Sequence, residues 1–162
     1  MIATSSVWIS TTVGVVGAIG PTDIVNVDEF IDAPRAVFGR TGVEIERQLG
    51  TPLGREVRPP RTGRDSGVAT HQQELSYPGL LIRLSGSSAL HRVAITASGF
   101  PLPRGLNVGT SRSDVERVLG EPQETTATRY LYLYSDGYPD TVEFYFRDDR
   151  VHRIEWMYWS GE

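Results

Sequence analysis

Three histidines and two pairs of acidic residues are the side chains of this chain whose types could support catalysis. Histidine can act as a general base or a metal ligand near neutral pH, and two close carboxylates can divide acid and base roles. The candidate acid pairs are Asp148 with Asp149 and Glu143 with Glu155. We interpret the first pair as a turn and the second as surface residues. The chain therefore shows no active site.

The histidines themselves have positions typical of a scaffold. The sequence Leu90-His91-Arg92-Val93 recurs as Val151-His152-Arg153-Ile154, so His91 and His152 are equivalent residues at the starts of two expected strands. The third, His71, lies in a polar stretch. The motifs of zinc proteases, serine hydrolases, P-loop enzymes and dinucleotide-binding enzymes are missing. We expect a protein that is not an enzyme, with no cofactor and no bound metal.

Composition narrows the function classes further. The chain of 162 residues has a net charge of −4, which argues against a general nucleic-acid binder. It has no cysteine, which excludes disulfides, thiolate metal sites and a cysteine nucleophile. All 16 basic residues are arginine, so a lysine Schiff base is excluded as well.

The aromatic residues are concentrated near the C-terminus, between Tyr130 and Trp159. Successive side chains of a strand point to opposite faces of its sheet. We place Leu131, Leu133, Val142, Phe144, Phe146, Ile154 and Trp156 on the buried face. Tyrosine, tryptophan and arginine are enriched in interface hot spots, so the opposite face is the candidate partner-binding surface. Its predicted residues are Tyr130, Tyr132, Tyr134, Tyr145, Arg147, Arg153 and Trp159. The alternatives are cross-strand pairs that only stabilise the sheet, or cover by another segment.

The elements that must position these residues follow from an internal repeat. Residues 39–52 read GRTGVEIERQLGTP, and residues 109–122 read GTSRSDVERVLGEP. Thr41 and Ser111 are N-cap residues, followed three positions later by an acid that can complete a capping box. A glycine with a proline after it ends each segment. The repeat predicts two short helices whose apolar faces carry Ile45 and Leu49, and Val115 and Leu119.

Strands are predicted after each helix. Leu80–Leu84 and Leu90–Ala97 follow the first, with a turn at 85–88, and 129–134, 142–147 and 150–156 follow the second. The fold class is therefore α+β: two tandem helix-plus-antiparallel-sheet units, with the helices on one face and an open sheet face. We assign residues 34–100 to the first unit and 101–162 to the second.

Two segments lie outside the repeated pattern. Residues 1–33 form an N-terminal lead-in, in which Val7–Ile9, Thr12–Ile19 and Asp23–Val27 are expected to be short strands or extended chain. Arg55–Gln73 is a long arginine-rich insertion between the first helix and its strands, and we interpret it as a solvated loop. A site for an acidic partner or a phosphate backbone is the alternative for this loop.

The helix motif and its following strands resemble two protein families. One is the SmpA/OmlA group, small lipoproteins of the bacterial outer-membrane assembly machinery; the other is the beta-lactamase-inhibitor protein, which carries the unit in tandem. The resemblance covers residues 37–97 and 105–159 and implies a broad, concave sheet surface that grips another protein. Its matching residues are structural: Gly39, Ile45, Leu49, Gly50, Pro52, Gly109, Val115, Leu119, Gly120 and Pro122. The acylated cysteine of the lipoproteins and the disulfides of the inhibitor are missing here.

Two functions follow from the pattern and the resemblance. The first is a non-catalytic protein-binding module, an inhibitor or immunity-type protein that binds a partner protein through its aromatic sheet face. The alternative is a cell-envelope scaffold or assembly subunit of the SmpA/OmlA kind. The partner is unknown, and a homodimer stays open. We expect no membrane span and no nucleic acid. The chain as given shows no export signal, which leaves cytoplasmic, periplasmic and secreted locations open.

Overall fold

The structure is a computed structural model, and it describes residues 21–59, 71–86, 88–137 and 139–159. The described strands form an eight-stranded sheet in the order β1-β2-β3-β4-β8-β7-β6-β5, and every neighbouring pair is antiparallel. The strands are β1 Gly54–Arg58, β2 Gln72–Tyr77, β3 Leu80–Leu84, β4 Leu90–Ile95, β5 Glu124–Thr125, β6 Arg129–Leu133, β7 Thr141–Arg147 and β8 Arg150–Met157.

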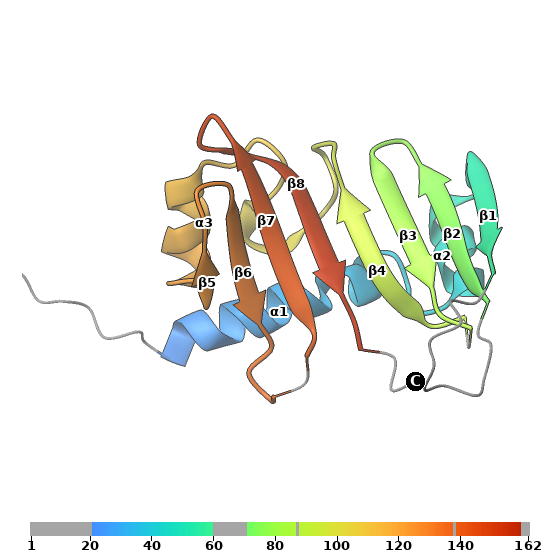
Figure 1. The fold of residues 1–162 in the computed structure, drawn as a ribbon, viewed down its shortest axis with the longest axis horizontal. Coiled ribbons are helices and arrows are strands. Elements are labelled where there is room, and N and C mark those ends of the chain that lie inside the picture. Colours follow the sequence, from blue (N-terminus) through green and yellow to red (C-terminus); the bar gives the residue numbers. More distant parts are fainter. Residues whose placement is uncertain (1–20, 60–70, 87, 138, 160–162) are drawn as a thin grey trace, which may run out of the picture.

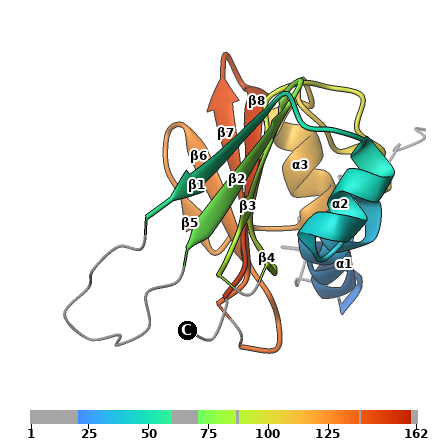
Figure 2. The same ribbon diagram turned by 90° about the vertical axis from the view of Figure 1, so that its right-hand side faces the viewer.

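The helices lie on one side of this sheet. They are α1 (Pro21–Val37), α2 (Gly42–Leu49) and α3 (Arg112–Leu119), with a 3-10 turn, η1, at Pro103–Gly105. In Figure 1, α2 lies behind the β1 end of the sheet, α3 lies behind the β5 end, and α1 runs between them behind the centre. Figure 2 shows the three α-helices on the same side of the strands. The α+β class is thus confirmed, and we call the side away from the helices the open face.

Both helices predicted from the repeat are present with their caps. Thr41 Oγ1 accepts a hydrogen bond from the N–H of Glu44, and Ser111 Oγ accepts one from the N–H of Asp114. Each helix ends at a glycine with positive φ, 79° at Gly50 and 77° at the equivalent residue of α3. Glu44 also reaches back, but to the N–H of Arg40, one residue before the N-cap.

The order of one short helix followed by four strands occurs twice, and the hydrogen bonds recur with it. Tyr77 donates its hydroxyl to the carbonyl of Gly50, and Tyr132 donates to the carbonyl of Gly120. Each N-cap residue also forms an isolated bridge at the start of the last strand of its half, Thr41 with Ala89 just before β4 and Ser111 with Arg150, the first residue of β8. The two halves meet where β4 pairs with β8.

The prediction of extended structure at Asp23–Val27 is wrong, because this segment lies inside α1. The glycines and the proline that punctuate the sequence over 14–21 suggested an extended lead-in, whereas the buried residues Val27, Phe30, Ile31 and Phe38 recur at the helical spacing. The predictions for Val7–Ile9 and Thr12–Ile19 lie outside the described residues. None of the described helices is long and apolar enough to cross a membrane.

The prediction of a continuous loop over Arg55–Gln73 is also wrong at both ends. Arg55 and Arg58 lie in β1, which pairs with β2 from Gln72 onward. Residues 60–70, with Arg61 and Arg64, lie outside the described part of the chain. The strands predicted at 80–84, 90–97, 129–134, 142–147 and 150–156 are confirmed within a residue or two at their ends.

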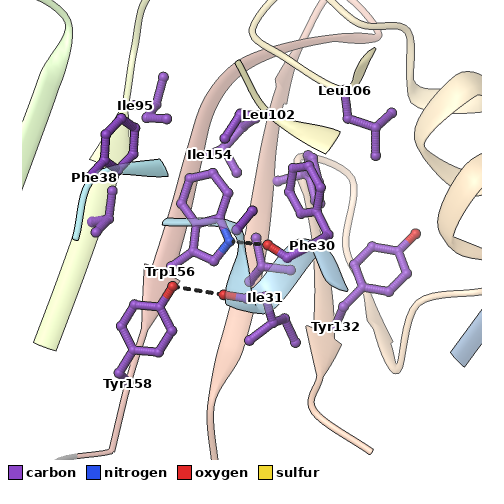
Figure 3. Close-up of a cluster of buried hydrophobic side chains, with 14 of the residues drawn as sticks. Phe30, Ile31, Phe38, Ile95, Leu102, Leu106, Tyr132, Ile154, Trp156 and Tyr158 are labelled. Atoms are coloured by element: carbon purple, nitrogen blue, oxygen red, sulfur yellow. Dashed lines mark hydrogen bonds between the residues drawn. The ribbon is translucent and has the colours of Figure 1, made fainter. Parts of the chain in front are cut away.

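The core lies between the sheet and α1 and is centred on the junction of the two halves (Figure 3). Phe30 stacks on Phe144 and Trp156, with ring centroids 5.4 and 5.5 Å apart. The Trp156 indole N–H donates to the Phe30 carbonyl at 2.9 Å, and the Tyr158 hydroxyl donates to the Ile31 carbonyl at 2.8 Å. The helix outside the repeat is therefore fixed to β7, β8 and the residue that follows β8.

Candidate functional site

The open face carries charged side chains on all eight strands. Residues that oppose each other in antiparallel strands point to the same face, so the register assigns these side chains to one surface. We call this set the charged belt. Its members, from β5 to β1, are Glu124, Arg129, Glu143, Tyr145, Arg153, Glu155, Arg92, Arg83, Glu74, Glu56 and Arg58.

At the β5 end the belt alternates in sign. Arg129 contacts Glu124 at 3.0 Å and Glu143 at 3.3 Å. The Tyr145 hydroxyl donates to Glu143, and burial followed by this hydrogen bond raises the pKa of Tyr145. The guanidinium of Arg153 lies 4.8 Å from the centre of the Tyr145 ring. Tyr145 thus connects the carboxylate of β7 to the arginine of β8.

At the junction of the halves, two arginines share one carboxylate. Arg92 on β4 and Arg153 on β8 both form salt bridges with Glu155, whose side chain is only 5% exposed. Glu155 lies opposite Ala94 in the pairing of β4 with β8. The small residue on β4 leaves room for both arginines to approach the same carboxylate.

Toward the β1 end, Glu74 is the shared carboxylate. Arg83 on β3 donates through Nε to Glu74 at 2.5 Å, and Arg58 on β1 contacts it at 3.3 Å. Arg58 also lies 3.9 Å from Glu56. Ion pairs that bury a carboxylate add little net stability, because desolvation offsets the attraction, and exposed ones contribute little as well, so we assign the belt the effect of presenting ordered charges on the open face.

Exposed apolar side chains lie beside the belt, toward the end of β8. Leu133 opposes Thr141, which opposes Met157, so these three residues form one row across β6, β7 and β8. Leu133 is 41% exposed and Met157 is 42% exposed. Trp159 follows β8 and is 59% exposed, while its backbone N–H donates to Asp140. We call Leu133, Met157 and Trp159 the apolar row.

Four of the seven predicted binding residues are accessible. Tyr145 and Arg153 lie in the charged belt and contact each other. Arg147 is exposed at the end of β7, beside the turn at Asp148 and Asp149, and Trp159 belongs to the apolar row. The structure therefore brings Tyr145 and Arg153 together and leaves Arg147 and Trp159 at opposite ends of the long strand pair.

The other three predicted residues lie on the helix side of the sheet, and their assignment to the open face is wrong. Tyr130 opposes the buried Phe144 and is 6% exposed, and Tyr132 opposes the buried Val142 and is fully covered. Tyr134 is half-buried, and its hydroxyl donates to Asp32 of α1. Leu131 and Leu133, which we placed in the core, take the open face instead.

The hydrogen-bond acceptors of the tyrosine hydroxyls explain why Tyr130 and Tyr132 face the helices and not the open face. A buried tyrosine needs a hydrogen-bond acceptor, and the carbonyl at the end of α3 accepts from Tyr132 at 3.0 Å. Glu116 of α3 accepts from Tyr130 at 3.2 Å. Burial raises the pKa of Tyr132 strongly, with the charge of Glu116 as a second cause, so this phenol stays neutral.

Several belt residues were missed from the sequence, namely Glu56, Arg58, Glu74, Arg83, Arg92, Glu124 and Arg129. Arg92 could have been predicted from the repeat. It occupies the position that matches Arg153, and Arg153 was assigned to the binding surface. The glutamates at 74 and 124 required strands β2 and β5, which the sequence analysis did not predict. Their role depends on the strand order, which places distant residues side by side.

Candidate metal ligands do not cluster in the described part of the chain. No group of three or more His, Asp or Glu side chains there is placed to hold a metal ion. His91 makes a 3.0 Å hydrogen bond through Nδ1 with the carbonyl of Tyr158. His152 lies half-buried at the far end of β8, beside Arg112 and Asp149.

Comparison with known proteins gives no family. No family model and no curated protein matches this chain. An extracellular protein containing an SCP domain from Bacillus anthracis str. Ames is similar over 93% of this chain and 50% of that protein, with 9% identity and a TM-score of 0.49. The chain thus spans about half of that protein. The uncharacterized protein yfeY from Escherichia coli is similar over 81% of this chain and 94% of its own, with 14% identity and a TM-score of 0.41.

Proposed function

We propose that this protein is a non-catalytic protein-binding module, of the inhibitor or immunity type, that holds its partner against the open face. The observation that carries this proposal is the placement of α1, α2 and α3 on one side of the sheet. No described helix covers the opposite side, which presents the apolar row next to the charged belt. Large apolar side chains gathered on a surface mark interaction sites more often than chance.

The matching hydrogen bonds of Tyr77 with Gly50 and of Tyr132 with Gly120 suggest that the two halves are copies of one unit. Such a duplication would support the proposal. Each half alone would provide four strands, and pairing β4 with β8 joins the two sets into one surface. Eight strands about 4.8 Å apart make a sheet roughly 34 Å wide. A surface of that width accommodates an interface of standard size, about 800 Å² per partner. A duplicated unit would thus serve to enlarge the binding surface.

The chemistry of the face also matches that of interfaces. Leu133, Met157 and Trp159 provide apolar anchors, and the belt provides the polar surroundings that a binding site needs around its centre. Glu143 and Glu155 are belt residues next to the apolar row, and Tyr145 and Arg153 follow them along β7 and β8. Because the belt is ordered by its own ion pairs, its side chains lose little freedom when a partner binds.

The test compares matched substitutions on the two sides of the sheet. Trp159→Ala and Met157→Ser alter the open face, whereas Val43→Ser alters α2, where Val43 is 71% exposed. The three variants and the unaltered protein serve as baits in extracts of the source cells, and the captured protein is then purified and measured by calorimetry. We expect the open-face variants to weaken binding by ~2 kcal/mol and Val43→Ser to bind normally. Loss of binding only with Val43→Ser would overturn the proposal.

A further inference from the structure

Like charges lie directly opposite each other at three places in the charged belt: Glu56 with Glu74, Glu143 with Glu155, and Arg83 with Arg92. An arginine contacts a member of each acidic pair, whereas Arg83 on β3 and Arg92 on β4 are the one pair of opposing cations within the belt. Like charges directly opposite destabilise a sheet. Burial lowers the pKa of Arg92, and repulsion by Arg83 is the next largest cause. The strands therefore accept a cost here that a bound anion would remove.

A depression of about 350 Å³ opens at this position, and we call it the arginine depression. Arg83, Arg92 and Arg153 line it, and no acidic side chain is among its lining residues. Their carboxylate partners, Glu74 and Glu155, lie beside it and are both nearly covered. Three guanidinium groups thus share two carboxylates.

The arginines also retain unused hydrogen-bonding capacity. Each guanidinium has five N–H donors in a planar fork that suits a carboxylate. Nε of Arg92 and Nε of Arg153 are buried without a hydrogen-bond partner among the described residues. The bond from Arg83 to Glu74 uses only its Nε. Leu81 and Ala94 add an apolar surface to the depression, against which the methylene groups of a ligand could pack.

We propose that the arginine depression binds the side-chain carboxylate of a glutamate or aspartate on the partner protein. This inference rests on the proposed function, since it names the group that the partner presents to the same face. A single carboxylate placed between Arg83 and Arg92 would offset the repulsion between these two opposing cations. A phosphate backbone fits less well, because Glu74 and Glu155 border the site and the net charge of the chain is −4.

Titration of the isolated protein with short capped peptides tests this assignment. The probes are acetyl-hexaglutamate amide and its neutral match, acetyl-hexaglutamine amide, and the readout is the NMR signals of the arginine Nε–H groups. We expect the glutamate peptide to shift the signals of Arg83, Arg92 and Arg153, and the glutamine peptide to leave them unchanged. Equal binding of both peptides, or no shift with either, would overturn the proposal.

Two substitutions on the open face distinguish binding of the peptide at the arginine depression from general electrostatic attraction to the face. Arg83→Gln should weaken the glutamate peptide about tenfold, because Glu74 keeps Arg58 as a partner and the strands stay paired. Arg129→Gln removes an equal charge at the other end of the belt and should change the affinity less than about twofold. Equal effects of the two variants would contradict a local site. Circular dichroism melts verify that both variants are folded.

Small anions and a nucleic acid are the remaining control ligands in this titration. Acetate that binds as tightly as the peptide would show a free-anion site instead of a docking site, and inorganic phosphate or a thymidine oligonucleotide that binds more tightly would replace the carboxylate assignment. The outcome is separable from the proposed function. If the peptide fails while Trp159→Ala still weakens the partner complex, only the assignment of the depression is wrong.

Discussion

Pro34 accounts for the position of Trp156 beneath α1. A proline inside a helix has no N–H for the carbonyl four residues earlier, and its ring pushes that carbonyl away. In this chain the affected carbonyl belongs to Phe30, which lies in the core. A buried carbonyl without a partner costs free energy, and the indole N–H of Trp156 satisfies it at 2.9 Å. One residue outside the repeat thus determines which side chain of β8 must carry a donor.

A double-mutant cycle tests this link. Trp156→Phe should lower the free energy of unfolding by ~2–4 kcal/mol, because it leaves the Phe30 carbonyl unpaired and removes buried volume. In Pro34→Ala the alanine N–H can pair with that carbonyl, so the same change should cost at least ~1 kcal/mol less. Urea denaturation of the four proteins measures the coupling.

Tyr158 offers the control for this cycle. Its hydroxyl donates to the Ile31 carbonyl, whose helical partner is the N–H of Arg35 and does not involve Pro34. Tyr158→Phe should therefore show no coupling to Pro34→Ala. If Trp156→Phe is additive with Pro34→Ala to within ~0.3 kcal/mol, the explanation is wrong.

At the scale of elements, the helices α2 and α3 were the easiest to predict from the sequence, because the same helix motif occurs in both. The caps and apolar spacing of α2 and α3 were readable because each signal depends on residues within one helix. The same holds for β7 and β8, whose turn at Asp148 and Asp149 takes positive φ at both residues. Local chemistry determines these elements.

Other elements depended on distant partners and were missed. The faces of β6 are set by α3, whose last carbonyl accepts the Tyr132 hydroxyl, and hydropathy alone placed Leu131 and Leu133 inside. The equivalent Tyr77 in the first half occupies the same place relative to Gly50, and comparing the halves would have corrected the assignment. Similarly, β5 has two residues and forms because β6 is beside it.

The observed faces of the sheet predict that a leucine-to-alanine substitution lowers the free energy of unfolding strongly on the helix side and only slightly on the open face. Leu119→Ala on α3, where Leu119 is 2% exposed, should cost ~2–5 kcal/mol because it opens a cavity in the core. Leu133→Ala on the open face should cost less than ~1 kcal/mol. Thermal and urea unfolding of both variants measures the difference. A larger loss for Leu133→Ala would restore the original assignment of β6.

At the scale of the whole molecule, the pairing of β4 with β8 combines two similar halves into one sheet. Arg92 and Arg153 occupy matching positions in the two halves and share Glu155 at their junction. The sequence predicted the class and a binding face on the C-terminal strands. It could not predict the strand order, and only that order extends the charged belt across both halves. The candidate site is thus a property of the assembled sheet.

Carbene footprinting of the protein alone and with its purified partner tests whether the partner binds the open face of the sheet. The reagent labels exposed side chains, and the described surface offers suitable reporters on both sides of the sheet. We expect the partner to reduce labelling of Leu133, Met157 and Trp159, while Val43 on α2 is labelled as before. A footprint that covers Val43 and leaves the apolar row fully labelled would contradict it, and would place the partner on the helix side.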